Sequence, residues 1–419
     1  MNMHLRIKAP RLGLFRHIPP IILLSSITIF TTYTWGRYVL FAAMVLIFLS
    51  DSCAYHLKFR HKIKGLFLNA LVLIFYAFAS SLWAAEPSGA TTNGKTLFEI
   101  LLMLVILYNH YISEEDGVRF FLLDIKIASF LIVIYTIIVY GVDNLMLLAK
   151  LERRMSKSFA NVNTIGMLAA IGVLIQLDEM LVARKVKALG VFCLPSIYLI
   201  ALTQSRKAIS MLLLGFCLIL WFRKVYSKNM KKTVPRLLFA TVMVVILLIQ
   251  VIQLPIFSGV MGRMEGLLNG IKGTGVADHS TNERNEMVRI GLEQFQKTPL
   301  FGIGMGNSYV LTRRYLGYDT YLHNNFVELL ACGGIVGFSI YYFMYAYLFL
   351  NYWNLRAYKN QEFSICLTIM IVMLVMDWGR VSYYAKTQWV YLLLYYIELE
   401  QLKRNKEKSA GALETEDAN

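Results

Sequence analysis

The sequence predicts an all-α fold, that of a polytopic helical membrane protein. Hydrophobic residues make up 57% of the 419 residues and charged residues only 16%, and the mean hydropathy is +0.54. This composition excludes an ordinary soluble domain. Apolar segments long enough to cross a bilayer recur along the whole chain, and in lipid such segments form helices because the backbone must satisfy its own hydrogen bonds.

We predict about twelve membrane-spanning helices in a single membrane domain, residues 1–402. The spans are expected at residues 18–34, 38–55, 65–85, 96–112, 120–140, 164–181, 189–203, 208–222, 237–254, 325–350, 364–379 and 388–402. One larger extracytoplasmic loop occupies about residues 255–324. Residues 403–419 are polar and are expected to form a disordered cytoplasmic tail.

The distribution of basic residues predicts the orientation. Of the 42 Lys and Arg residues, 24 fall in alternate short segments that include both termini. Such short basic loops face the cytoplasm. Both termini are therefore predicted to be cytoplasmic, and the loops 141–163, 255–324 and 380–387 to lie outside together with Arg206. The net charge of +16 fits this bias and an attraction to anionic lipid. A nucleic-acid partner is not expected, because no basic stripe lies on a soluble domain.

Two outer segments carry basic residues in unusual positions. Arg206 lies in the tight turn Leu202–Lys207 between two spans. It is either an interfacial anchor or a guanidinium that grips a diphosphate. The segment 281–295 reads as an amphipathic helix on the membrane face, stopped by Pro299. Arg284 lies near its start, where the helix dipole disfavours a cation, which suggests a bound anion.

The most informative motif is His323-Asn324, nine residues, and then Gly334-Ile335-Val336-Gly337. It places a titratable imidazole where the long loop re-enters the membrane, with small residues further down the helix for close approach. Asn324 is expected to orient the ring or a sugar hydroxyl. Glu328 lies inside the span, where a carboxylate is costly and is usually functional or paired.

Other polar groups are predicted on the same face. The basic and amide residues that join the candidate site are Arg153, Arg154, Asn163, Arg313, Arg314 and Arg380. Arg380 has a second interpretation, an ion pair with Asp377 that closes a helix end. Gly302–Asn307 is expected to be a flexible turn rather than a phosphate loop. No metal site or cofactor is predicted, because no acidic cluster accompanies the outer histidines. The five cysteines lie in apolar spans without CxxC spacing and are interpreted as buried small side chains.

This set of residues resembles the bacterial O-antigen ligase and O-antigen polymerase superfamily. The resemblance covers about residues 153–380. It rests on the His323 motif with its Gly334 and Gly337 spacing, on the turn around Arg206, and on the helix that carries Arg284.

The resemblance implies a large helical membrane fold and an inverting, metal-independent glycosyl transfer outside the cytoplasm. The donor would be an oligosaccharide on undecaprenyl diphosphate. Arg206 and Arg284 would bind the diphosphate with help from Arg313 or Arg314. His323 would be the general base, with a pKa expected near 7.

The acceptor distinguishes two family activities. A polymerase, which we favour, extends a second lipid-linked repeat unit, whereas a ligase transfers the polysaccharide to lipid A core. A lipid-linked oligosaccharide flippase is the alternative from another class. It is less favoured because the acidic residues within spans lie near helix ends rather than at mid-membrane. The expected location is the bacterial cytoplasmic membrane, and a chain-length regulator is a further partner to consider.

Overall fold

The computed structural model describes residues 13–30, 33–55, 64–114, 116–151, 153–156, 159–183, 189–225 and 279–416. This part of the chain is all-helical and contains no strand. The predicted fold class is therefore confirmed for the described residues. The predicted span 237–254 lies outside them.

Four helices are long and apolar enough to cross a membrane: α4 (Pro87–Ile112), α5 (Gly117–Tyr140), the segment Val162–Leu181 of α7, and Asn325–Tyr358, which includes α14. Shorter apolar segments of 10–17 residues occur at Ile18–Ile29, Leu66–Leu82, Cys193–Thr203 and Phe363–Gly379. Three further predicted spans, at residues 38–55, 208–222 and 388–402, lie on helices that are not among these candidates. These findings do not confirm a count of twelve.

The remaining bounds complete the description. The α-helices are α1 (Ile18–Ile29), α2 (Gly36–Tyr55), α3 (Leu66–Ala79), α6 (Val142–Lys150), α7 (Val162–Ala183), α8 (Leu189–Thr203), α9 (Arg206–Val225), α12 (His279–Lys297), α13 (Ser308–Leu316), α14 (Asn325–Leu355), α15 (Phe363–Met376) and α16 (Lys386–Glu416). Short 3-10 turns are η1 (Gly13–Arg16), η2 (Ser80–Leu82), η4 (Arg356–Tyr358) and η5 (Asp377–Gly379).

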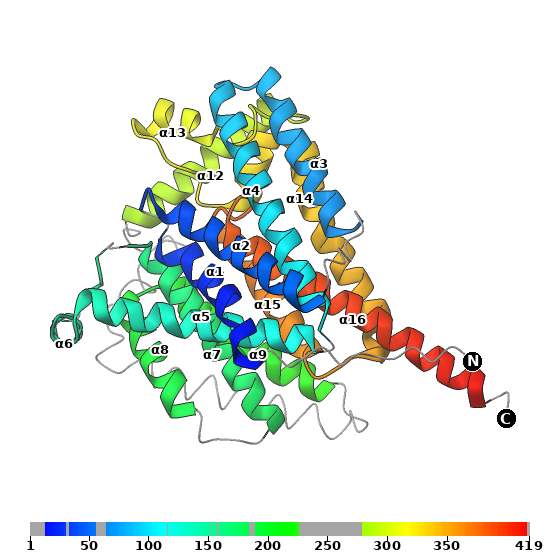
Figure 1. Cartoon of the computed structure of the whole chain (residues 1–419). Helices are drawn as coiled ribbons and strands as arrows, with labels where there is room; N and C mark the ends of the chain where they lie inside the picture. Colours follow the sequence, from blue (N-terminus) through cyan, green and yellow to red (C-terminus); the bar gives the residue numbers. More distant parts are fainter. Residues whose placement is uncertain are drawn as a thin grey trace.

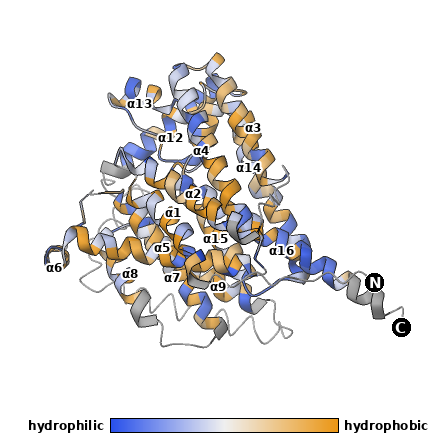
Figure 2. Cartoon of the chain, viewed as in Figure 1, coloured by the Kyte–Doolittle hydropathy of each residue, from blue (hydrophilic) through white to orange (hydrophobic). Residues whose placement is uncertain are grey.

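The apolar helices form one bundle, and α12 and α13 lie at one end of it (Figure 1). Within the bundle α7 packs against α5, α8 and α9, while α14 packs against α3 and α16. Hydrophobic residues dominate the bundle helices, and hydrophilic residues dominate α12, α13 and the far part of α16 (Figure 2). The polar face that carries the predicted site is therefore placed on top of an apolar scaffold.

Polar contacts divide the ends of the helices into two groups. At the α12–α13 end, Ala85 donates its backbone N–H to Ile303 at 2.9 Å and Glu86 donates to Asn307 at 2.8 Å. At the other end, Arg223 of α9 binds Asp178 of α7 and the carbonyl of Gln361. Hydrogen bonds thus join neighbouring segments at each of these two ends.

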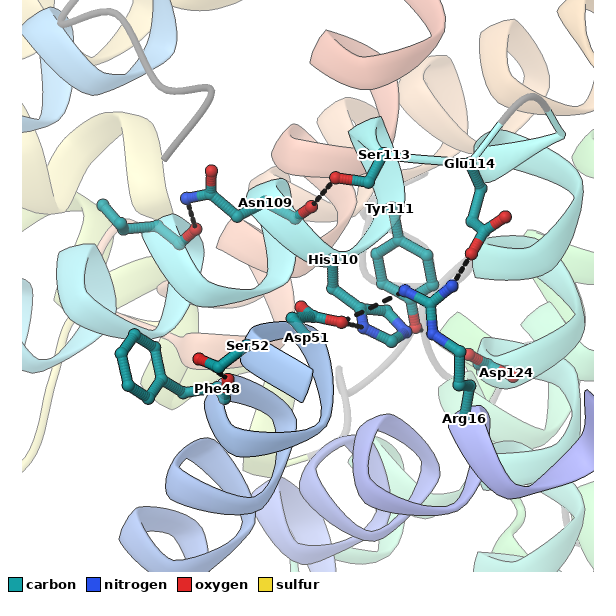
Figure 3. Close-up of polar contacts among 11 residues, drawn as sticks. Arg16, Phe48, Asp51, Ser52, Asn109, His110, Tyr111, Ser113, Glu114 and Asp124 are labelled. Carbon is teal, nitrogen blue, oxygen red and sulfur yellow. Dashed lines mark hydrogen bonds and ion pairs between the residues drawn. The ribbon is translucent and has the colours of Figure 1, made fainter. Parts of the chain in front are cut away.

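A buried polar network joins the first helices at the end opposite α12 and α13 (Figure 3). Arg16 binds both Asp51 and Glu114, and His110 contacts Asp51 at 2.8 Å. Asp124 is fully buried; His17 lies 2.6 Å from it, and the Tyr111 hydroxyl donates to it at 2.7 Å. The network ties η1, α2, α4 and α5 together through charged and hydrogen-bonded side chains.

Three segments differ from the sequence-based expectations. Residues 403–416, expected to be disordered, continue α16. Lys403 pairs with Glu400 one turn earlier, and Asn405 reaches the carbonyl of Tyr358, so the start of this segment is anchored. The loop 141–163 contains the helix α6. The turn Gly302–Asn307 is packed, because Ile303 donates to Ala331 of α14 at 3.1 Å and accepts from Ala85.

Candidate functional site

His323 lies immediately before α14, and its backbone has a positive φ of 56°. This left-handed conformation is uncommon for a residue with a side chain and is often maintained at functional positions. The Asn324 side chain caps α14 by accepting hydrogen bonds from the N–H groups of Phe326 and Val327, at 3.0 and 3.2 Å. The cap fixes where the helix begins and thereby where the imidazole lies. The His323 imidazole packs beside the Tyr321 ring, with the two ring centroids 4.2 Å apart.

Glu328 does not act on the imidazole through a hydrogen bond. Its carboxylate accepts from the Ser308 hydroxyl and, at 2.8 Å, from the backbone N–H of Leu322. It therefore connects α13, α14 and the loop that carries His323. The prediction that it binds substrate remains a prediction, but the structure gives this carboxylate a clear positioning contact.

The nine-residue spacing of the motif has a structural cause. Gly334 breaks α14 with φ 60° and ψ −166°. At this kink, Ile335 and Val336 donate their N–H groups to the carbonyls of Pro299 and Leu300 instead of to their own helix. A Cβ atom on Gly334 would lie 2.3 Å from the Leu300 carbonyl oxygen. The nine residues thus lie between the Asn324 cap and the kink, where the loop around Leu300 accepts hydrogen bonds from the helix backbone.

The turn before α9 places two cations at a helix N-terminus. Gln204 adopts φ 45° in this turn, and Ser205 accepts a long hydrogen bond from the N–H of Ala208. Arg206 and Lys207 are the first residues of α9. The positive end of the helix dipole disfavours cations and attracts anions. The Lys207 ammonium donates to the carbonyl of Gly379, so α9 is joined to η5, the 3-10 turn that follows α15.

The cations act on one another and on the imidazole. Burial, followed by the charges of Arg284 and Lys207, lowers the pKa of His323 to about 4. Burial, followed by the charges of Arg284, Arg380 and Arg206, lowers the pKa of Lys207 to about 7. Groups from four separate segments therefore converge in one electropositive site. The expected pKa near 7 for His323 differs from this value because neither burial nor the neighbouring charges can be read from the sequence.

The helix α12 carries Arg284 to this site. Met287 and Ile290 are buried against α13 and α14. A Cβ atom on Gly291 would lie 2.4 Å from a methyl carbon of Val327, so the helices touch closely there. Arg289 lies on the exposed side and pairs with two glutamates of its own helix. Apolar residues of α12 thus pack on the neighbouring helices, while Arg289 with its glutamate partners lies on the outer side.

Several predicted site residues have other partners. Arg154 donates to the Thr203 carbonyl at 2.9 Å and to Asn163 at 2.8 Å, so this pair supports the turn before Arg206. Arg313 binds Asp319 through two bonds of 2.7 Å and also binds Glu86 at 2.9 Å. Two carboxylates thus already bind the Arg313 guanidinium, which disfavours its predicted role of binding a diphosphate. Arg153 and Arg314 are exposed.

Arg380 contributes its charge to the cation site but does not pair with Asp377. Its guanidinium donates to Gln388, and its Nε atom is buried without a hydrogen bond in the described part of the chain. Asp377 instead accepts from Ser382 at 2.6 Å and from Tyr342 at 3.2 Å. The two side chains thus form no direct ion pair, although the charge of Arg380 acts on Asp377.

Lys207 is the residue that sequence analysis missed. The signal was its position next to Arg206, at the start of the same apolar helix.

No group of three or more His, Cys, Asp or Glu side chains that could hold a metal ion occurs among the described residues.

A comparison with protein families finds a match, and it covers most of the residues of the cation site. Residues 191–342 match the family model described as O-antigen ligase. The match supports the resemblance to the O-antigen ligase and polymerase superfamily, and with the apolar helices it indicates a bacterial inner-membrane protein. No curated protein matches the chain. The matched region includes Arg206, Lys207, Arg284 and His323, whereas Arg154 and Arg380 lie outside it.

Proposed function

We propose that this protein is an inverting glycosyltransferase that polymerises oligosaccharide repeat units carried on undecaprenyl diphosphate. The observation that carries the proposal is a group of four cations: the charges of Arg206, Arg284 and Arg380 act on Lys207, and those of Lys207 and Arg284 act on His323. Such a group of cations suits a diphosphate, because guanidinium groups bind phosphate oxygens through paired, charge-assisted hydrogen bonds. The single imidazole beside it supplies a proton acceptor.

In the proposed reaction, a hydroxyl oxygen of the acceptor sugar attacks the anomeric carbon of the donor. The new C–O bond forms as the bond from this carbon to the diphosphate oxygen breaks, which inverts the anomeric configuration. His323 takes the hydroxyl proton, and the lipid diphosphate leaves with the bonding electrons. Arg206 and Arg284 stabilise the negative charge that grows on the leaving oxygen. Lys207 adds a third donor when it is protonated.

The donor itself tunes the base. With a pKa of about 4, His323 is a weak proton acceptor before substrate binds. A diphosphate between Arg284 and Lys207 adds negative charge that offsets these two cations, and this raises the pKa of the imidazole. General bases work best when their pKa lies near the working pH. The imidazole therefore becomes a stronger base after the donor is in place, because two of the three causes that lower its pKa are offset while its burial remains.

We place this chemistry on the extracytoplasmic face, because the short basic segments lie at the opposite ends of the helices. A second candidate function is transfer to lipid A core, which the family description of O-antigen ligase favours. Polymerase and ligase would use the same donor site and the same base. They differ only in the acceptor.

The test uses purified protein in lipid nanodiscs with a synthetic lipid-diphosphate-linked repeat unit. A ladder of extended products supports polymerisation, whereas transfer only to added lipid A core assigns the ligase function. Neither product from correctly folded protein would contradict the proposal. EDTA should leave the rate unchanged if the arginines replace a metal.

The His323→Ala, Arg206→Ala and Arg284→Ala variants should each lower turnover about a hundredfold or more. Arg289→Ala is the matched control, because Arg289 lies on the same helix as Arg284 but faces outward with its own glutamate partners. It should keep at least half of the activity. Near-normal turnover of a site variant would exclude that residue from the mechanism.

A further inference from the structure

A second site, with no basic side chain among its described lining residues, lies beside the cation group. A cavity of about 390 Å³ opens between the first turns of α4, the start of α13 and the loop that precedes α16. Thr92, Asn93 and Thr96 line the cavity from α4. Tyr321 lines it from the loop before α14, and Tyr384 from the loop before α16. A cavity of this volume can hold one or two sugar rings.

The lining is suited to a neutral, hydroxyl-rich ligand. Hydroxyl and amide groups supply both donors and acceptors, and the tyrosine rings offer flat apolar faces. No basic residue is among the described lining residues, so the cavity does not match a diphosphate. Glu328 is its one carboxylate, and Ser308 and Leu322 already hold that group.

Tyr321 connects the two sites. It lines the cavity and its ring also packs against that of His323. The charge of Arg284 acts on both of these side chains, so the cation group lies near the same pair. The imidazole therefore lies between a cationic site and a hydroxyl-lined site.

An inverting displacement requires this kind of arrangement, because the nucleophile approaches the anomeric carbon from the face opposite the leaving group. If the leaving diphosphate occupies the cation group, the attacking sugar must come from the other side of the reacting centre. The cavity is a polar space next to His323 that can supply it.

We propose that this cavity is the acceptor subsite, which binds the sugar whose hydroxyl attacks the donor. The proposal rests on the glycosyltransferase function proposed above. It assigns Thr92, Thr96, Tyr321 and Tyr384 to recognition of an oligosaccharide rather than to binding of the lipid diphosphate.

The test narrows the cavity from α4. Thr92→Phe places a large ring in the opening, where the native side chain is exposed. Lys95→Phe is the matched control, because Lys95 is exposed on the same helix and does not line the cavity. A second pair, Thr96→Leu with Thr91→Leu as its control, removes a lining hydroxyl with little added volume and covers the case in which Thr92→Phe does not fold.

Two measurements separate this proposal from the proposed function. Saturation-transfer NMR follows binding of the repeat-unit oligosaccharide, freed of lipid and phosphate, to the protein in nanodiscs. Two-substrate kinetics gives a KM for the donor and a KM for the same free oligosaccharide as acceptor. Thr92→Phe should weaken oligosaccharide binding and raise the acceptor KM at least tenfold, while the donor KM and both values for Lys95→Phe stay within twofold of wild type.

Each other outcome has a definite meaning. Unchanged oligosaccharide binding in folded Thr92→Phe and Thr96→Leu overturns the acceptor subsite, even if transfer is normal. A raised donor KM with an unchanged acceptor KM also overturns it and assigns the cavity to the donor sugar. If wild type binds the oligosaccharide but forms no glycosidic product from the lipid-linked repeat unit either, the proposed function fails while the carbohydrate site stands.

Discussion

The carboxylate of Glu328 accepts a hydrogen bond from the backbone N–H of Leu322 at 2.8 Å. Leu322 directly precedes His323, so a side chain inside α14 holds the loop that presents the imidazole. The Ser308 hydroxyl also donates to this carboxylate, which connects the same contact to α13. The position of the proposed base therefore depends on a residue that need not touch the substrate.

Substitutions of Glu328 distinguish a positioning role for its carboxylate from a role in acid–base catalysis. Glu328→Gln keeps an oxygen that can accept from Leu322 and gains an N–H that can bind the Ser308 oxygen. We expect this variant to retain roughly a tenth or more of wild-type kcat, whereas Glu328→Ala loses about a hundredfold because two buried donors are left unpaired. Turnover in nanodiscs measures both. A loss in Glu328→Gln equal to that in Glu328→Ala would instead assign a proton-transfer role to the carboxylate.

The charges around His323 and Lys207 predict a bell-shaped pH profile. The imidazole must be unprotonated to act as a base, so kcat/KM should fall only as the pH drops toward about 4, below the usual range of histidine. Lys207 must be protonated to bind phosphate, so kcat/KM should also fall as the pH rises through about 7. In kcat, the acid limb should lie at higher pH, because bound diphosphate raises the pKa of the imidazole.

Lys207→Arg checks the assignment of the alkaline limb. A guanidinium stays protonated across this range, so the fall near pH 7 should disappear while the acid limb remains. Lys95→Arg serves as the control and should leave the profile unchanged. An alkaline limb that persists in Lys207→Arg would show that another group titrates there.

Hydropathy and the local motif could predict the helical fold and the positions of Arg206, Arg284 and His323. The membrane spans follow from the apolar composition. The Asn324 cap and the spaced glycines of the motif follow from local rules for where helices begin and where they permit close approach. The same reasoning missed Lys207 and assigned Arg313 to the diphosphate. Arg313 pairs with Glu86, which is 227 residues away in the sequence, and no local pattern reveals such a contact.

The protonation of His323 could not be predicted for a related reason. A pKa depends on burial and on the positions of neighbouring charges, and both arise from packing between distant segments. The helical continuation of α16 also depends on a tertiary contact, that of Asn405 with Tyr358. Composition alone favoured disorder there.

The kink in α14 provides a stability prediction with an internal control. Gly334→Ala should lower the free energy of unfolding by about 3 kcal/mol or more, because the new Cβ meets the Leu300 carbonyl at 2.3 Å at a backbone position with a positive φ. Gly317→Ala has a similar positive φ of 83° but no atom within 4 Å of the new Cβ. It should cost only about 1 kcal/mol. Thermal unfolding in detergent compares the two; equal losses would show that the Leu300 contact does not matter.

The buried network at the opposite end predicts a loss of stability without a loss of chemistry. Asp124 accepts from the Tyr111 hydroxyl and contacts His17 with no exposed surface (Figure 3 shows Tyr111 and Asp124). Asp124→Ala leaves both partners unpaired and should lower the free energy of unfolding by about 3 kcal/mol, whereas alanine at the exposed Asp143 should lower it by less than about 0.5 kcal/mol. Turnover per folded molecule should stay near that of wild type below the melting temperature, because α4, at 26 residues, separates the two ends by about 40 Å. A large fall in kcat of folded Asp124→Ala would instead show that this network is coupled to the site around His323.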